Sequence, residues 1–378
     1  MEIINFPALH VQNIPGKISV SKEIIEKNLV LKGDVLFNRT SETEDEIALS
    51  TVYLDEEPVI FGGFVIRGRP KNEKLTDGYK KYCFRSKIFR SALIRAGQGA
   101  VRSNIGQKDL DKIVITFPDK KEQLRIVSIL ETWDKAIEKI ELKIAVKKKV
   151  KEGLTLRLLL GQFAANINRK FRKTRFFKVP ENWDVVRIED VATQVTEKND
   201  QDLVLPVLSC TKHFGLVDSL KFFKKQVFSK KLDTYKIVQR DHFVYATNHI
   251  EEGSIGLQNL YEAGLVSPMY TVFQVNERIL STYLYALLKT ELFRCIFEAS
   301  TSASVDRRGS LRWKVFKKIE IPLSPIEEQK LIAQILTKAD NEISALIKKL
   351  LKLKEQRDFL LNSMISGRIR TPENMSIS

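Results

Sequence analysis

Two loops of this 378-residue chain contain the residue types that hydrogen-bond phosphates and base edges. Their small residues let a backbone approach a ligand closely, while amide and guanidinium groups donate to phosphate oxygens and base edges. The candidates from residues 97–104 and 300–308 are Gln98, Arg102, Asn104, Thr301, Ser302, Arg307 and Arg308. An ordinary solvated loop has the same composition, so a DNA contact and a plain surface loop both remain open.

Polar residues also follow two predicted strands. Asn38 and Arg39 come directly after the apolar run at residues 35–37, and Asn248 follows the run at residues 242–246. Side chains at strand ends commonly line binding sites, since loops carry function on a rigid scaffold. We therefore add these three residues to the candidate DNA contacts.

A basic stretch, residues 169–178, contains no acidic residue. Such a stretch can follow a phosphate backbone, and Arg172 and Arg175 are its candidates. The alternative is a solvated linker of the same composition.

A search for catalytic groups finds no motif. The four histidines lack metal-ligand spacing, and the chain has neither a Walker phosphate loop nor a Gly-x-Ser-x-Gly elbow. The three cysteines form no Cys-x-x-Cys pair, which argues against a disulfide framework and favours reduced packing residues. We therefore expect no catalytic residue, and no metal or cofactor bound by this chain.

The composition favours an acidic partner. Lys and Arg number 63 against 47 Asp and Glu, giving a net charge of +16, while 43% hydrophobic residues indicate an ordinary globular protein. The length predicts two or more domains. No signal segment or apolar run of about 18 residues is present, so we expect a cytoplasmic protein without a membrane segment.

An internal repeat organises the chain. Residues 122–134 (EQLRIVSILETWD) match residues 328–340 (EQKLIAQILTKAD), 206 positions later, and the match continues without a gap for about forty positions. Before these segments the similarity is looser but keeps its order: residues 33–37 answer residues 240–244. Each half is therefore a variable block followed by a similar helix.

Both repeated segments carry an apolar heptad seam. Its members are Ile126, Leu130, Trp133, Ile137, Ile140 and Ile144 in the first segment, and Ile332, Leu336, Ile343, Leu346, Leu350 and Leu353 in the second. Each seam needs a partner. We expect the two helices to pack antiparallel on one another; the alternative is that each docks on its own domain.

An antiparallel register has definite consequences. If Ile126 lies opposite Met364, Lys147 and Lys151 face Asp340 and Glu342, which can neutralise them. Arg357 is then expected near the ring of Trp133. A helix over residues 126–158 is a rod of roughly 50 Å at 1.5 Å per residue.

The variable blocks alternate short β-branched or aromatic runs with helical patterns at residues 79–96 and 281–298. The predicted fold class is therefore mixed α/β (α+β), with two pseudo-repeated domains and an antiparallel pair of long coiled-coil helices between them. Topology beyond that is not readable from the sequence.

These features together resemble the specificity subunit of type I restriction-modification systems. The resemblance rests on residues 322–329 (PLSPIEEQ), the heptad helix, residues 367–369 (GRI), and residues 179–183 (VPENW), which are similar to the family's Pro-x-x-Trp motif. Its tandem plan covers nearly the whole chain. The implied boundaries are a first target-recognition domain at 1–118, spacer helices at 119–163 and 324–369, a basic linker at 164–178, and a second target-recognition domain at 179–323.

The resemblance implies a subunit without catalytic activity. Each target-recognition domain would read one half of a split site in double-stranded DNA, with half-sites on the order of 10 to 15 base pairs apart. Two methyltransferase subunits would dock on this chain, and motor-nuclease subunits would complete the complex. These partners would use S-adenosylmethionine, ATP and Mg2+. Two alternatives stay open: a basic coiled-coil adaptor, and an inactive recombination reservoir of recognition domains.

The chain departs from the family pattern at one point. The motif at residues 180–183 has no counterpart ahead of the first block, because residues 6–9 already answer residues 205–208. We expect the first domain to be shortened at its amino terminus. Three explanations remain open. Another part of the protein supplies the opening strand of this domain, or the strand is missing only because the start codon was misassigned. If the strand is truly absent, the first domain is impaired.

Overall fold

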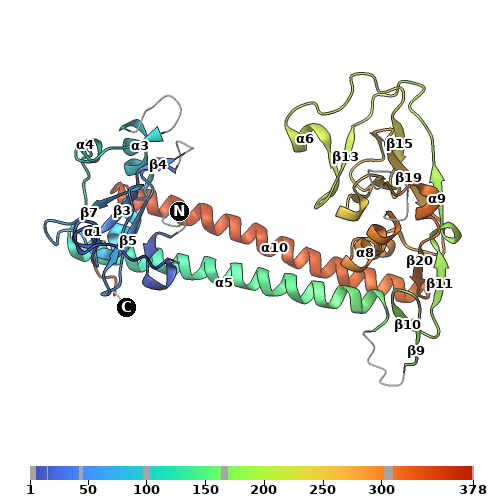
Figure 1. Cartoon of the computed structure of the whole chain (residues 1–378), viewed down its shortest axis with the longest axis horizontal. Helices are drawn as coiled ribbons and strands as arrows, with labels where there is room; N and C mark the ends of the chain where they lie inside the picture. The colour runs from blue at the N-terminus through green and yellow to red at the C-terminus, as the bar shows by residue number, and fades with distance from the viewer. Residues whose placement is uncertain are drawn as a thin grey trace. The chain divides into compact units, whose positions relative to one another are not determined.

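The computed structural model describes residues 6–14, 16–41, 46–96, 103–162, 169–301 and 310–376, with only the backbone of residues 96, 103 and 104. The chain divides into two compact units, residues 1–143 with 346–378 (unit 1) and residues 144–345 (unit 2). Two long helices, α5 (Lys120–Leu159) and α10 (Ile326–Ile365), each have one part in either unit (Figure 1).

Unit 1 is built on a four-stranded sheet in the order β1 (Ala8–Leu9), β5 (Ser50–Tyr53), β3 (Val35–Asn38) and β7 (Val65–Gly68). The β1–β5 pair is parallel, and the others are antiparallel. The remaining elements are η2 (Val11–Asn13), α1 (Lys22–Asn28), β2 (Leu29–Val30), β4 (Thr40–Ser41), β6 (Val59–Ile60), α2 (Asp77–Cys83), α3 (Lys87–Ala96), β8 (Ser103–Asn104) and α4 (Gln107–Leu110).

Unit 2 contains an antiparallel sheet in the order β12 (Ala192–Val195), β19 (Tyr270–Val275), β16 (Phe243–Ala246) and β17 (Ile255–Leu257). Its other strands are β9 (Phe171–Lys173), β10 (Lys178–Pro180), β11 (Asp184–Arg187), β13 (Leu208–Thr211), β14 (Gly215–Asp218), β15 (Lys236–Gln239), β18 (Ala263–Val266) and β20 (Glu320–Leu323). Its other helices are η4 (Ile188–Asp190), α6 (Ser219–Phe223), η5 (Ile250–Glu252), α7 (Ser281–Leu288), α8 (Glu291–Thr301) and α9 (Trp313–Phe316). Both units mix helices and strands, as predicted.

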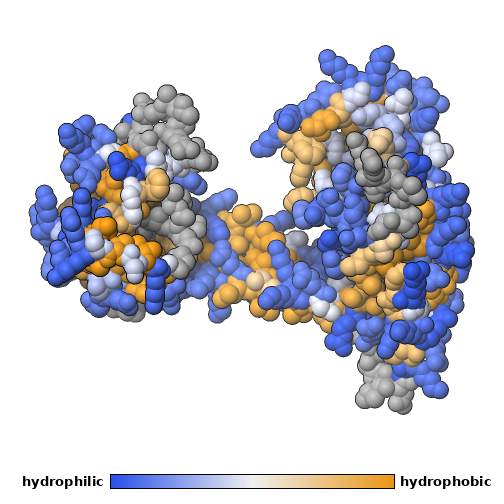
Figure 2. Space-filling view, viewed as in Figure 1, coloured by the Kyte–Doolittle hydropathy of each residue, from blue (hydrophilic) through white to orange (hydrophobic). Residues whose placement is uncertain are grey.

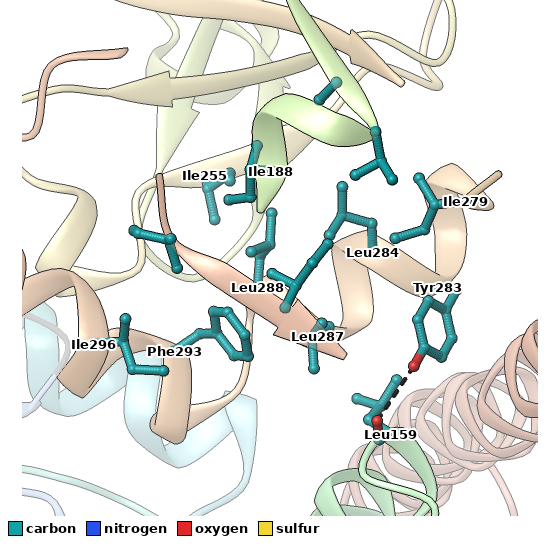
Figure 3. Packing of buried hydrophobic residues seen from close by; sticks show 14 of the residues in the cluster. Leu159, Ile188, Ile255, Ile279, Tyr283, Leu284, Leu287, Leu288, Phe293 and Ile296 are labelled. Atoms are coloured by element: carbon teal, nitrogen blue, oxygen red, sulfur yellow. Dashed lines mark hydrogen bonds between the residues drawn. The ribbon is translucent and has the colours of Figure 1, made fainter. Parts of the chain in front are cut away.

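The largest core lies in unit 2. Leu284 and Leu288 of α7 pack with Phe293 of α8 and with strand residues such as Ile255 (Figure 3). The hydroxyl of Tyr283 donates to the Leu159 carbonyl at 3.3 Å, which joins α7 to the end of α5. This buried apolar surface gives the unit a rigid base for its surface loops.

Each predicted helix in the variable blocks is in fact two helices. Ser86 interrupts the first: its hydroxyl donates to the Cys83 carbonyl at 2.7 Å and accepts from Phe89 N at 3.5 Å. Thr290 does the same between α7 and α8, accepting from Phe293 N at 3.4 Å. A hydroxyl side chain that caps the start of a new helix competes with the backbone hydrogen bonds of one continuous helix. Apolar periodicity does not report this competition, so it predicted neither break.

Within unit 1, α5 and α10 run antiparallel. Ile126 and Leu130 share a buried cluster with Leu361 and Met364, and Lys354 pairs with Glu141 at 2.7 Å. Ile126 therefore lies near Met364, as the antiparallel register predicted.

The predicted contact of Arg357 with Trp133 is wrong. Arg357 Nε binds Asp134 at 3.0 Å, and its guanidinium lies 5.5 Å from the ring centroid of Tyr82. The Tyr82 hydroxyl also donates to Asp134, at 2.7 Å. Packing of α2 on the helices places this carboxylate and ring beside Arg357, and a carboxylate attracts guanidinium more strongly than a ring face does.

Within unit 2 the two helices are again antiparallel, and both lysines bind the acids that were predicted to face them. Lys147 binds Glu342 at 2.9 Å, and Lys151 binds Asp340 at 2.5 Å. The seam residues of the two helices are buried or half-buried throughout, namely Ile126, Leu130, Trp133, Ile137, Ile140, Ile144, Ile332, Leu336, Ile343, Leu346, Leu350 and Leu353. The heptad pattern therefore identified the contacting faces correctly.

The basic stretch is not a plain linker, because it contains a β-hairpin. Strands β9 and β10 pair antiparallel, with Arg172 opposite Val179. Phe177 and Val179 are buried in the core of unit 2. Alternating apolar residues after the turn fix this hairpin to the unit.

A turn in unit 1 repeats the Pro-Glu-Asn turn of unit 2. Trp183 N donates to the Pro180 carbonyl at 3.0 Å, and Met375 N donates to the Pro372 carbonyl at 3.2 Å. The segment after α10 thus has the same Pro-Glu-Asn turn, with Met375 at the position that Trp183 occupies in unit 2.

No helix among the described residues is both long enough and apolar enough to cross a bilayer.

Candidate nucleic-acid interface

In unit 2 the end of a candidate strand is bonded to the segment that follows a candidate loop. Strand β16 ends at Ala246, and the next residue, Thr247, accepts a hydrogen bond at its carbonyl from Leu311 N at 2.9 Å. Leu311 lies just after the loop that contains several candidates. The strand end with Asn248 and the segment after the loop are therefore joined through the backbone.

Unit 1 shows the same connection. The carbonyl of Arg39, directly after β3, accepts from Ile105 N at 3.0 Å. Beside it, Thr40 of β4 pairs with Asn104 of β8. Arg39 itself is exposed and its N–H is bound to the Phe64 carbonyl, so the side chain projects from a fixed backbone.

Two predicted DNA contacts are corrected by their burial. Asn38 is completely buried, and its Nδ2 donates to the Glu46 carbonyl at 3.3 Å. Thr301 is 6% exposed and donates to the Glu298 carbonyl at 2.7 Å. Asn38 is the last residue of an interior strand and Thr301 faces the core from the end of α8, so neither reaches a base edge.

The other candidates differ in what the structure describes. Asn104 has a placed backbone only, and Asn248 is half-buried. Arg172 donates to the Trp183 carbonyl at 2.5 Å, and the Arg175 guanidinium lies 4.9 Å from the Phe176 ring centroid. Outside the described residues are Gln98, Arg102, Ser302, Arg307 and Arg308.

Sequence analysis missed an aromatic ridge in unit 2, formed by Phe214, Phe222 and Phe223. These side chains are 68%, 44% and 38% exposed. Phe222 joins the others, with ring-centroid distances of 5.6 Å to Phe214 and 5.0 Å to Phe223. Figure 2 shows a hydrophobic patch over α6 with hydrophilic residues around it. The interleaved lysines and phenylalanines of residues 221–225 were the available signal.

The ridge is connected to the candidate strand end. Lys212, at the tip of the β13–β14 hairpin, lies 3.9 Å from Glu252 of η5, the short helix that follows Asn248. Lys289 Nζ donates to the carbonyls of Lys212 at 2.9 Å and Gly253 at 2.8 Å. Burial lowers the pKa of Lys289, which is fixed by these carbonyls rather than by an acid. The hairpin tip and the strand-end loop thus form one surface.

One group in the described part of the chain has the residue types of a metal site. His249, Glu251 and Glu252 offer ligand atoms that lie within 4.8 Å of one another. His249 Nδ1 is 3.4 Å from Glu252. His249 and Glu252 are exposed, and exposed acidic groups of this kind are common without an ion.

Known proteins share this plan. A family model described as "Type I restriction modification DNA specificity domain" matches residues 11–148 and 180–355. The chain belongs to this family. The type I restriction enzyme MjaVIII specificity subunit of Methanocaldococcus jannaschii is 26% identical to it, over 82% of this chain and 74% of that protein.

Solved structures show the same fold. A chain from a type I R-M system, solved in work on its complex assembly and conformational transition, gives a TM-score of 0.57 at 17% identity, covering 90% of this chain and 83% of that one. The HsdS subunit from Thermoanaerobacter tengcongensis gives a TM-score of 0.50 at 18% identity, with 90% and 82% covered. Family model and relatives together identify a specificity subunit of a type I restriction-modification system.

Proposed function

We propose that this specificity subunit reads a bipartite target in double-stranded DNA, one half with each unit, and performs no catalysis itself. The observation that carries the proposal is the equivalent backbone connection in both units, Arg39 to Ile105 and Thr247 to Leu311. Each unit thus presents a strand end and a loop exit on one surface. The net charge of +16 supplies sequence-independent attraction to phosphates.

The proposal assigns candidate base contacts to Arg39 in unit 1 and Asn248 in unit 2. Guanidinium and amide groups pair in bidentate fashion with guanine and adenine edges, respectively. Further candidates, known from the sequence alone, are Gln98, Arg102, Asn104, Ser302, Arg307 and Arg308, with Arg172 and Arg175 as phosphate contacts. Unit 1 has its own buried core, including Val35, Phe37 and Leu93, which supports a functional first reader over an inactive reservoir.

In this proposal α5 and α10 act as a spacer, so that the half-sites lie about 10 to 15 base pairs apart. The ion pairs of Lys151 with Asp340 and of Arg357 with Asp134 support a fixed antiparallel register.

Two methyltransferase subunits and motor-nuclease subunits would dock on the helices and supply chemistry with S-adenosylmethionine, ATP and Mg2+. The helices expose apolar side chains that a partner can cover: Leu142, Val146, Val150, Leu331, Leu351 and Phe359. These side chains are 50% to 61% exposed, and apolar surface of this extent on both helices favours a protein partner that covers it over permanent contact with solvent.

The test is co-expression with a cognate methyltransferase subunit, followed by sequencing of the modified adenines. The expected motif has two specified parts separated by unspecified bases. Arg39→Ala should relax one part and Asn248→Ala the other, while Lys330→Ala, an exposed change on α10, should leave both parts intact. A single continuous motif would contradict the proposal, and salt-dependent binding without a preferred site would favour a basic adaptor.

A further inference from the structure

We propose that the aromatic ridge of Phe214, Phe222 and Phe223 is a wedge that stacks against an opened base step of duplex DNA. This inference rests on the proposed function, because it assumes that unit 2 binds DNA. It adds a means of distorting the target to the base contacts proposed above. Apolar wedges of this kind unstack and kink duplexes in other DNA-binding proteins.

The first argument is exposure. All three rings are more than a third exposed although they contact one another, and Leu220 beside them is 54% exposed. A contiguous apolar patch on a surface marks an interaction site more often than scattered exposed residues do. The fold of unit 2 leaves these rings outside its buried clusters.

The second argument is a rigid mounting. Thr211 Oγ1 accepts from Phe214 N at 3.1 Å and donates to the Gly215 carbonyl at 3.0 Å, which fixes the hairpin turn. A Cβ at Gly256 would lie 2.5 Å from Leu216 N, so β17 and the hairpin pack with their backbones in close contact. A mounted aromatic group loses little conformational entropy on binding, which suits a wedge.

The third argument is charge. Lys212, Lys221, Lys224 and Lys225 are exposed around the ridge. Two of them have acidic neighbours: Lys212 lies 3.9 Å from Glu252, and Lys221 lies 3.6 Å from Asp218, the sole acidic residue in the sequence from 211 to 225. Lys224 and Lys225 keep the charge around the ridge positive. Cations around an apolar centre can attract the phosphates of DNA while the aromatic rings at the centre stack on bases. This complementarity favours DNA over an apolar groove on a protein partner.

Unit 1 provides a natural comparison. Its helix α1 also exposes two adjacent apolar residues, Ile24 at 45% and Ile25 at 40%, but they lie between Glu23 and Glu26. The pair lacks aromatic faces, and its acidic neighbours repel phosphates. We therefore expect the distortion only in the half-site read by unit 2.

The experiment uses the full-length chain and a duplex selected by it from a random pool, with 2-aminopurine placed at successive positions. Wild type should raise 2-aminopurine fluorescence at one step of the unit 2 half-site. Phe214→Ala/Phe222→Ala should lose that signal and bind on the order of tenfold more weakly, while keeping the slope of affinity against salt. Ile24→Ala/Ile25→Ala, the matched control, should keep signal and affinity.

The outcomes separate the two proposals. No selective DNA binding by the wild type would overturn the proposed function together with the wedge. Selective wild-type binding with unchanged fluorescence and affinity in the phenylalanine variant would overturn the wedge alone. If the phenylalanine variant binds DNA like wild type but no longer co-purifies with the methyltransferase, the wedge is likewise overturned and the ridge is a contact surface for a protein partner. Phe222→Leu, which keeps apolar bulk without the ring, should retain the fold and lose most of the fluorescence signal.

Discussion

Gln123 and Gln329, which occupy the same position of the internal repeat, make equivalent sets of three hydrogen bonds. Gln329 Oε1 accepts from Leu280 N at 2.8 Å, and its Nε2 donates to the carbonyls of Arg278 at 3.0 Å and Ser324 at 2.8 Å. Gln123 bonds in the same way, at 2.9 Å each, to Thr76 N and the carbonyls of Lys74 and Pro118. Each glutamine thereby fixes the start of a long helix to the segment before α2 or α7.

Gln329→Leu should lower the free energy of unfolding by about 3 kcal/mol, because it leaves one N–H and two carbonyls without a partner in a buried position. Urea unfolding of the full chain measures the change. Gln334→Leu, exposed on the same helix, is the matched control and should change stability by less than about 0.5 kcal/mol. Equal losses in the two variants would contradict a buried hydrogen-bonding role.

Reversing one ion pair tests the helix register. Lys151→Glu places a carboxylate beside Asp340, where the side chains are 30% and 56% exposed, so the expected loss is only about 1 kcal/mol. Adding Asp340→Lys should restore most of that stability by recreating the pair with opposite polarity. Thermal unfolding of the single and double variants measures the coupling, and strictly additive losses would argue against the contact.

Two glycines should respond oppositely to alanine. A Cβ at Gly256 would meet the Leu216 backbone at 2.5 Å, so Gly256→Ala should destabilise the protein by about 1–3 kcal/mol. Nothing lies within 4 Å of a Cβ at Gly153, which is exposed within α5, and Gly153→Ala should stabilise it by roughly 0.5–1 kcal/mol. Denaturant titrations of both variants provide the comparison. A stabilising Gly256→Ala would contradict the close packing of the hairpin on β17.

Asp218 should make unit 2 sensitive to acid. The Tyr261 hydroxyl, opposed by burial and assisted by the Lys221 N–H, holds the pKa of the Asp218 carboxyl below its ordinary value of 3.8. A lowered folded-state pKa stabilises the fold above the ordinary value, and this stabilisation is lost as pH falls through the folded pKa. Wild type should therefore be more stable than Asp218→Asn near neutrality, with the difference shrinking below about pH 4. A pH-independent difference in urea unfolding would refute the contribution of this charge.

The sequence by itself determined the duplicated plan, the contacting faces of the long helices and the acidic stretch that Lys147 and Lys151 face. These features follow from periodicity, because residues three or four apart share one face of a helix and a heptad seam needs an apolar partner. Lys147 and Lys151 could therefore be placed opposite the stretch with Asp340 and Glu342 without coordinates, while the structure decided which acid each lysine binds. The missed helix breaks at Ser86 and Thr290 needed the position of each hydroxyl relative to its backbone partners.

Only the tertiary structure decided which candidate side chains are buried and which segments meet. Asn38 and Thr301 are buried and donate to the carbonyls of Glu46 and Glu298, whereas the ring of Phe214 remains exposed outside the core. Composition treats all three as loop or strand-end residues. The pairing of Thr247 with Leu311 likewise depends on chain folding across a long sequence separation, since local pattern specifies a segment's conformation but not its distant neighbour.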